Sequence, residues 1–191
     1  MRLPEKAAFP VALISAGLLW LGFPGGGEVW PLLFIGLVPL LLLTPLGSAK
    51  KRFFYGLVVG LCHFLFQLYW IVFVLGRYGG LAWYFTYPAT VLLSLYMALY
   101  FGCFLVLAGG VLQRWGAMAF FWLAPCLWVG LDWLRGVLFS GFPWMDLGYG
   151  LWQGPYLLQT ADLFGHHFLT FVIVLTNVTL FLLIYKSEKN F

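Results

Sequence analysis

The chain has 191 residues, of which 63% are hydrophobic and only 8% are charged, and its mean hydropathy is +0.97. A water-soluble domain carries about 25% charged residues, so this composition excludes a soluble globular fold. It predicts an all-α membrane protein, a bundle of helices that crosses the bilayer several times. The formal net charge of +4 is small and gives no indication of nucleic-acid binding.

Charged residues divide the chain into apolar stretches, and several are close to the about 20 residues that a helix needs to cross the hydrocarbon. The stretch between Arg77 and Arg114 is longer, at 36 residues. Pro88 and Pro125 lie within two of these stretches, where each predicts a kink or a weakened turn. The sequence therefore predicts a single domain, residues 1–191, with a loop at 140–163. About six transmembrane helices are expected, near 8–23, 30–46, 53–75, 82–111, 117–139 and 164–185.

The basic residues predict the orientation of this bundle. Six crossings place both termini on one side, and every lysine and arginine except Arg77 and Arg135 falls on that side. Because cytoplasmic segments are enriched in lysine and arginine, both termini are predicted to be cytoplasmic. The loop at 140–163 then faces outward, together with the turns at 22–31 and 77–80.

These outward segments share glycine, proline and aromatic residues. Tryptophan and tyrosine suit the headgroup layer because an apolar ring carries a polar N–H or O–H group. The tryptophans and tyrosines near this face are Trp30, Trp83, Tyr84, Trp144, Tyr149, Trp152 and Tyr156. An aromatic belt at the membrane surface accounts for most of them.

Asp132 and Arg135 are the charged residues nearest to the outward loop. They are three residues apart, so they share one helix face and can form an ion pair. A lone charge at the bilayer centre costs about 2.5–3.5 kcal/mol on insertion scales, which favours pairing. Two interpretations stay open: an ion pair that anchors the outward loop, or a polar site that receives a phospholipid headgroup.

The third predicted span carries two packing signals. Gly56 and Gly60 form a GxxxG pattern, which predicts a close approach to a neighbouring helix. His63 and Gln67 lie four residues apart on the same helix. Polar groups on a membrane helix usually bond to a neighbouring helix, and we expect that of both.

The remaining histidines and cysteines give no sign of a metal centre. His166 and His167 are adjacent, so they are expected to point to different helix faces and not to chelate one ion. Cys62, Cys103 and Cys126 lie in apolar runs and predict small buried side chains. The sequence predicts no metal, no cofactor and no catalytic residue in this chain.

Several motifs, in order along the chain, resemble the membrane domain of apolipoprotein N-acyltransferases. They are Phe23-Pro24 with Val29-Trp30-Pro31, Tyr69-Trp70 ahead of Tyr78-Gly79-Gly80, Ala124-Pro125-Cys126-Leu127-Trp128, Asp132-Trp133-Leu134-Arg135-Gly136, Gly141-Phe142-Pro143-Trp144 and Gly148-Tyr149. The family usually has glutamate where Asp132 stands. It also usually continues with serine and glutamine where Gly150 and Leu151 follow here.

The resemblance implies an eight-helix base in the bacterial cytoplasmic (inner) membrane, joined to an outward nitrilase-like domain with a Glu–Lys–Cys catalytic set. The cysteine takes an acyl chain from a phospholipid and passes it to the N-terminal amine of a diacylglyceryl lipoprotein. Nothing in this chain matches that domain, and an outward domain needs an odd number of preceding crossings. We therefore expect a truncated membrane base that is inactive alone.

The resemblance also suggests which residues face lipid or support the outward loop: Asp132, Arg135, Gly141, Phe142, Pro143, Trp144, Tyr149, Trp70 and Trp30. The expected partners are the phospholipid bilayer, a diacylglyceryl lipoprotein and a nitrilase-like domain, fused or separate. Two other functions stay open. One is a membrane anchor for another enzyme, such as a polyprenyl-phosphate glycosyltransferase, and the other is a small transporter.

Overall fold

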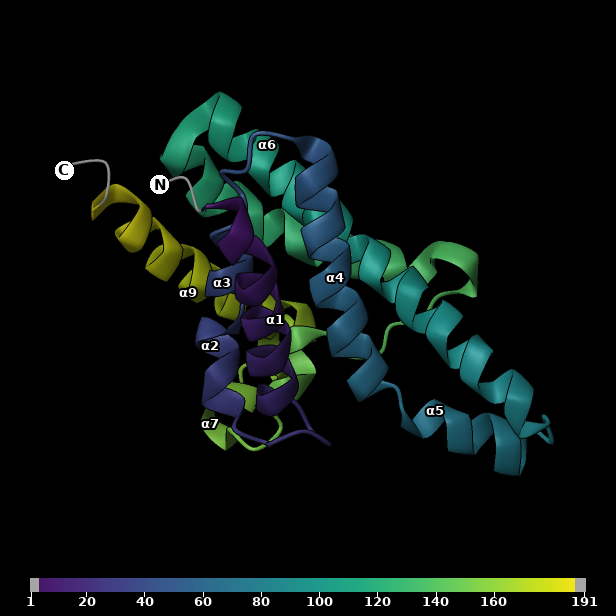
Figure 1. The fold of residues 1–191 in the computed structure, drawn as a ribbon. Helices are drawn as coiled ribbons and strands as arrows, with labels where there is room; N and C mark the ends of the chain where they lie inside the picture. Colours follow the sequence, from purple (N-terminus) through teal and green to yellow (C-terminus); the bar gives the residue numbers. More distant parts are fainter. Residues whose placement is uncertain (1–3, 188–191) are drawn as a thin grey trace.

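The computed structural model describes residues 4–187, and within them every regular element is helical (Figure 1). This confirms the predicted all-α fold. The longer helices are α1 (Glu5–Gly22), α4 (Ala49–Gln67), α6 (Trp83–Val137) and α9 (His166–Ser187). Short helices connect them: η1 (Trp30–Leu32), α2 (Leu33–Gly36), α3 (Val38–Leu41), α5 (Trp70–Phe73), η2 (Val74–Tyr78, a π-helix), η3 (Leu138–Ser140), η4 (Leu147–Leu151), α7 (Pro155–Leu158) and α8 (Ala161–Phe164).

The lengths and compositions of these helices fit a membrane protein. Two helices of the described chain, α6 and residues His166–Lys186 of α9, are long and apolar enough to cross a bilayer. A third span results if α4 is counted with Trp70–Tyr78, which continues it after a bend of 49°. Lys6–Gly22 and Trp30–Leu41 are apolar but shorter.

Helix α6 contains the predicted fourth and fifth spans as two legs. Gly116 has φ 79° and ψ −172°, a left-handed conformation that glycine adopts without steric cost, and it breaks the helix. The chain then turns back on itself (Figure 1), so that the ring centroids of Phe104 and Trp128 lie 4.7 Å apart. The two predicted spans are therefore joined by one glycine rather than by a loop.

The predicted span at 30–46 is not one helix but three short ones. Pro39 lies in the first turn of α3 and has no N–H to donate to the preceding turn. The side chain of Asn177, on α9, fills the break at Leu37. Its Oδ1 accepts from the Leu37 N–H at 2.9 Å, and its Nδ2 donates to the Leu33 carbonyl at 2.8 Å.

The predicted loop at 140–163 is also more ordered than expected. It contains η4, α7 and α8, and η4 packs against α9. Figure 1 shows α7 near the end of α1, away from the start of α4 and the reversal of α6. We call the end of the molecule that carries α7 the loop end, and the end where α4 begins the Arg52 end.

Helices α4 and α6 make the most extensive contact between two helices in the described chain, and the GxxxG pattern of α4 lies within it. A Cβ atom added at Gly56 would lie 2.5 Å from the Phe101 carbonyl oxygen, and one at Gly60 would lie 2.8 Å from Ala98 Cα. Backbone atoms cannot move aside as a flexible side chain can. Both glycines are therefore required for the two helices to touch.

Replacing Gly56 with alanine should destabilise the protein although alanine is the better helix former. The helix-propensity gain is at most about 1 kcal/mol, whereas overpacking against backbone costs about 1–3 kcal/mol. The midpoint of thermal unfolding in detergent measures the balance. Gly17→Ala is the matched control, because a Cβ at Gly17 meets nothing within 4 Å. Equal midpoints for the two variants would contradict the contact.

Candidate functional site

The predicted ion pair at the end of α6 is present and buried. Asp132 Oδ1 lies 3.2 Å from Arg135 Nη2, and the side chains are 7% and 2% exposed. Their spacing of one helical turn brings them together on the face that points into the fold. An arginine at this depth needs charged partners, since an unpaired buried charge is strongly unfavourable.

A second carboxylate, which sequence reasoning did not single out, completes the cluster. Asp146 follows the Gly-Phe-Pro-Trp segment, and only 1% of its side chain is exposed. Its Oδ1 accepts from Arg135 Nη2, and its Oδ2 lies 3.0 Å from His166 Nε2 at the start of α9. Arg135 thus lies between Asp132 and Asp146, and the cluster joins α6, the loop and α9.

The backbone after α6 folds so that Asp146 can reach Arg135. Gly141 has φ +79°, and a Cβ there would lie 2.0 Å from the Gly136 carbonyl oxygen, so only glycine fits. The Phe142 N–H donates to the Arg135 carbonyl at 3.0 Å, which turns the loop back over the helix end. Met145 also has a positive φ, 64°, which costs energy in a residue other than glycine.

Gly148 fixes the other end of the loop against α9. Its N–H donates to Thr170 Oγ1 at 3.0 Å, and a Cβ there would lie 2.6 Å from the His166 carbonyl oxygen. This close approach brings Asp146 beside His166. Thr170 is a further residue that the sequence did not indicate.

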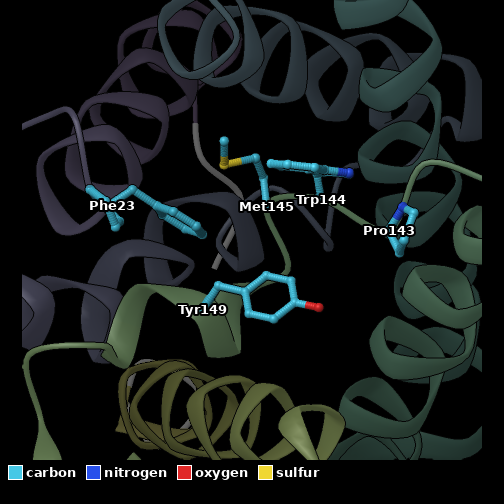
Figure 2. A pocket seen from close by; sticks show the side chains of 6 residues that line it. Phe23, Pro143, Trp144, Met145 and Tyr149 are labelled. Atoms are coloured by element: carbon cyan, nitrogen blue, oxygen red, sulfur yellow. The ribbon is translucent and has the colours of Figure 1, made fainter.

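An apolar pocket of about 460 Å³ lies beside the charged cluster. Figure 2 shows its wall, with the side chains of Met145, Trp144 and Tyr149 around the opening and Phe23 opposite Pro143. We call it the aromatic pocket. It is lined by Phe23, Pro24, Pro143, Trp144, Met145 and Tyr149.

Ring contacts hold the wall of the aromatic pocket in place. Trp144 lies 5.5 Å from Trp70 and 6.2 Å from Phe142, measured between ring centroids. Tyr149 stacks on His166 at 4.9 Å with 13° between the planes. Partial burial, reinforced by the nearby Asp146 carboxylate, raises the pKa of Tyr149 above its usual value, so its phenol stays protonated at neutral pH.

The predicted site residues are therefore gathered, with one exception. Pro143, Trp144 and Tyr149 line the pocket, and Trp70 and Phe142 pack against Trp144. Asp132 and Arg135 belong to the charged cluster, and Gly141 makes the turn that leads to it. Trp30 lies apart, against Phe34 and beside Gly154.

His166 and His167 lie closer together than expected. Their ring centroids are 4.0 Å apart, and nitrogen atoms of both rings face Asp146 Oδ2, at 3.0 and 3.8 Å. The expectation that they point to different faces was wrong, because α9 begins at His166, directly after Gly165 with φ +77°. The three ligand atoms lie within 4.8 Å of one another, close enough for one cation. Asp146 already accepts from Arg135, so such a cation would compete with a guanidinium.

The polar residues of α4 behave differently from one another. Gln67 Nε2 donates to the Pro24 carbonyl at 3.3 Å, so it bonds the turn after α1 rather than a helix. His63 Nδ1 is buried without a hydrogen-bond partner in the described part of the chain. Its ring instead packs against Phe23 and Phe64, with centroids 5.2 and 5.0 Å away. Both residues support the pocket from behind.

The long apolar helices are those of a helical membrane protein. One end of the helix bundle carries the buried charged cluster and the aromatic pocket. A model of the apolipoprotein N-acyltransferase N-terminal domain matches residues 15–179. The chain belongs to this family, which confirms the resemblance seen in its motifs.

Individual relatives agree with the family match. Apolipoprotein N-acyltransferase of Geobacter metallireducens is 37% identical over 189 residues, covering 96% of this chain and 36% of that protein. The protein of the same name from Rhodopirellula baltica is 33% identical, covering 87% of this chain and 29% of its own length. That of Vibrio parahaemolyticus is 29% identical, covering 78% and 29%. The chain thus spans about a third of the length of these relatives.

Removing the central cation of the cluster should be far more damaging than removing one carboxylate charge. Arg135→Met leaves Asp132 and Asp146 buried without a cation, and we expect destabilisation of about 3–5 kcal/mol. Asp146→Asn leaves the ion pair of Asp132 and Arg135 intact, so it should lower the free energy of unfolding by less. Unfolding in detergent measures both. Arg77→Met, at an exposed position, is the control, and an Arg135 variant as stable as this control would refute the assignment.

Proposed function

We propose that this chain forms the membrane base of an apolipoprotein N-acyltransferase and presents phospholipid to its catalytic domain. The aromatic pocket beside the charged cluster carries this proposal. Its wall is apolar, as an acyl chain requires, and it lies at the loop end, where the family motifs gather. The names of the relatives supply the reaction, acyl transfer to a lipoprotein.

Burial supports the first of the two interpretations of Asp132 and Arg135, an ion pair that anchors the loop. Arg135 is 2% exposed, and its terminal nitrogen already faces two carboxylates. A lipid phosphate could not reach it without breaking those pairs. We therefore assign Asp132, Arg135 and Asp146 to holding the loop, with Gly141 and Phe142 shaping it. We assign the lipid contacts to Pro143, Trp144 and Tyr149, and Trp70 supports the ring of Trp144. Trp30 is assigned to the headgroup layer.

The same proposal includes about six crossings of the bacterial inner membrane with both termini in the cytoplasm. The proposal is supported by α1, α4, α9 and the two legs of α6, which overlap expected spans, whereas the stretch at 30–46 forms only short helices. The start of α1 and the end of α9 lie toward the Arg52 end in Figure 1. Lys50 and Arg52 are at the start of α4, and Arg114 lines one cavity with Arg52. Basic residues at that end favour a cytoplasmic location for it. The loop end then faces outward, toward a nitrilase-like domain and a diacylglyceryl lipoprotein.

A chimera tests the proposal. The chain replaces the matching N-terminal part of the Geobacter metallireducens enzyme, and mass spectrometry measures N-acylation of a diacylated lipopeptide. The chimera should be active, whereas the chain alone should not be. Acylation by the purified chain would contradict this division of roles.

Point variants of the chimera locate the lipid site. Trp144→Ala should raise the KM for phospholipid about tenfold, because one ring wall is lost, an effect of about 1–3 kcal/mol. Trp122→Ala is the matched control, since Trp122 is similarly exposed, 55% against 52%, and lies on the second leg of α6. Asp132→Asn and Arg135→Ala should instead lower folded yield or kcat. Unchanged kinetics in all of these variants would leave only an aromatic belt.

A further inference from the structure

A second cavity lies at the Arg52 end, where α4 begins and α6 turns back. Its volume is about 490 Å³. One side carries the cations Arg52 and Arg114. The other side is apolar and is formed by both legs of α6, through Leu107, Val111 and Leu127. The cavity shares no lining residue with the aromatic pocket.

Arg52 is buried beside this cavity, and no acidic side chain of residues 4–187 pairs with it. Its exposed fraction is 6%, and its Nη1 donates to the Leu46 carbonyl at 2.9 Å. Its Nε has no hydrogen-bond partner among residues 4–187, and no ion pair is recorded for it there. A Cβ at Gly109 would lie 2.6 Å from Arg52 Cδ, so the absence of a side chain at Gly109 makes room for the arginine. A buried cation without a carboxylate partner is unfavourable, and a bound anion would stabilise it.

The start of α4 adds to the positive potential at the same place. Ser48 precedes the helix and gives no side-chain cap, so the first N–H groups are not satisfied by it. Lys50, Lys51 and Arg52 occupy the first turn. Cations at the positive end of the helix dipole are unfavourable, whereas an anion there is stabilising.

We propose that this cavity binds an anionic phospholipid. The phosphate lies between Arg52 and Arg114 near the start of α4, and an acyl chain lies along Leu107, Val111 and Leu127. The apolar side distinguishes a lipid from a free anion. The enrichment of cations in cytoplasmic segments explains exposed basic residues, but it does not explain a buried arginine beside a cavity. The site is separate from the aromatic pocket, so lipid binding there can be tested without measuring acyl transfer.

Native mass spectrometry of the purified full chain tests the site. Micelles are titrated with phosphatidylglycerol or phosphatidylcholine of identical acyl chains, and bound lipid is counted. Phosphatidylglycerol should bind at lower concentration. Arg52→Gln and Arg114→Gln should each weaken its binding about fivefold, the effect of one basic residue beside an anionic lipid. Arg114 is exposed, so its variant leaves the interior intact.

Filling the cavity provides a test that does not change charge. Gly110 lines the cavity, and a Cβ there meets nothing within 4 Å, so Gly110→Leu adds volume without a clash. It should reduce phosphatidylglycerol binding at least as much as the arginine variants. Gly17→Leu is the matched control, because a Cβ at Gly17 is equally unobstructed and Gly17 does not line the cavity.

The outcomes separate clearly. Equal affinity for the two lipids, or wild-type binding by Gly110→Leu, would overturn the proposal. Millimolar inorganic phosphate should not displace the lipid, because it gains nothing from the apolar side. Displacement would assign the cavity to a free anion and overturn the lipid assignment.

Discussion

The loop end depends on one physical constraint, a single arginine buried in an otherwise apolar helix bundle. Arg135 needs carboxylates within reach, and Asp132 supplies one from the same helix. The other, Asp146, is supplied by a loop that must turn sharply to place it. Gly141 permits that turn, Gly148 lets the loop approach α9, and His166 closes the cluster. The same loop supplies four of the six residues that line the aromatic pocket, so the ion pairs that hold the loop also shape the pocket.

This arrangement separates the charged groups from the lining of the aromatic pocket. The charged groups pair with one another, although Asp132 Oδ2 and Arg135 Nε have no hydrogen-bond partner among the described residues. The residues that line the pocket are aromatic residues, prolines and a methionine. Asn177 performs a comparable task in the interior, where its amide replaces a missing helical hydrogen bond between Leu37 and Leu33. Both devices keep polar groups paired where no water can reach them, which is the central requirement for a chain within a bilayer.

The features that the sequence predicted well are those set by local spacing. Apolar length located the helices, and the three-residue spacing of Asp132 and Arg135 located their pair. The failures come from long-range contacts. The helix at 30–46 is broken in a way that depends on Asn177, which is 140 residues from Leu37. Asp146 reaches Arg135 only through positive φ angles that periodicity does not encode. Charge balance gave no signal for it, because Asp132 alone already neutralises Arg135.

The two buried arginines show how partners distinguish a structural charge from a binding charge. Arg135 is enclosed by carboxylates of its own chain, so an external anion gains little by approaching it. Arg52 is also buried, but its hydrogen bond within the described chain goes to a neutral carbonyl, and an open cavity adjoins it. Burying a guanidinium costs desolvation energy, and among the described residues carboxylates compensate only Arg135. An anionic headgroup at Arg52 would supply the compensation that Asp132 and Asp146 supply at the other end.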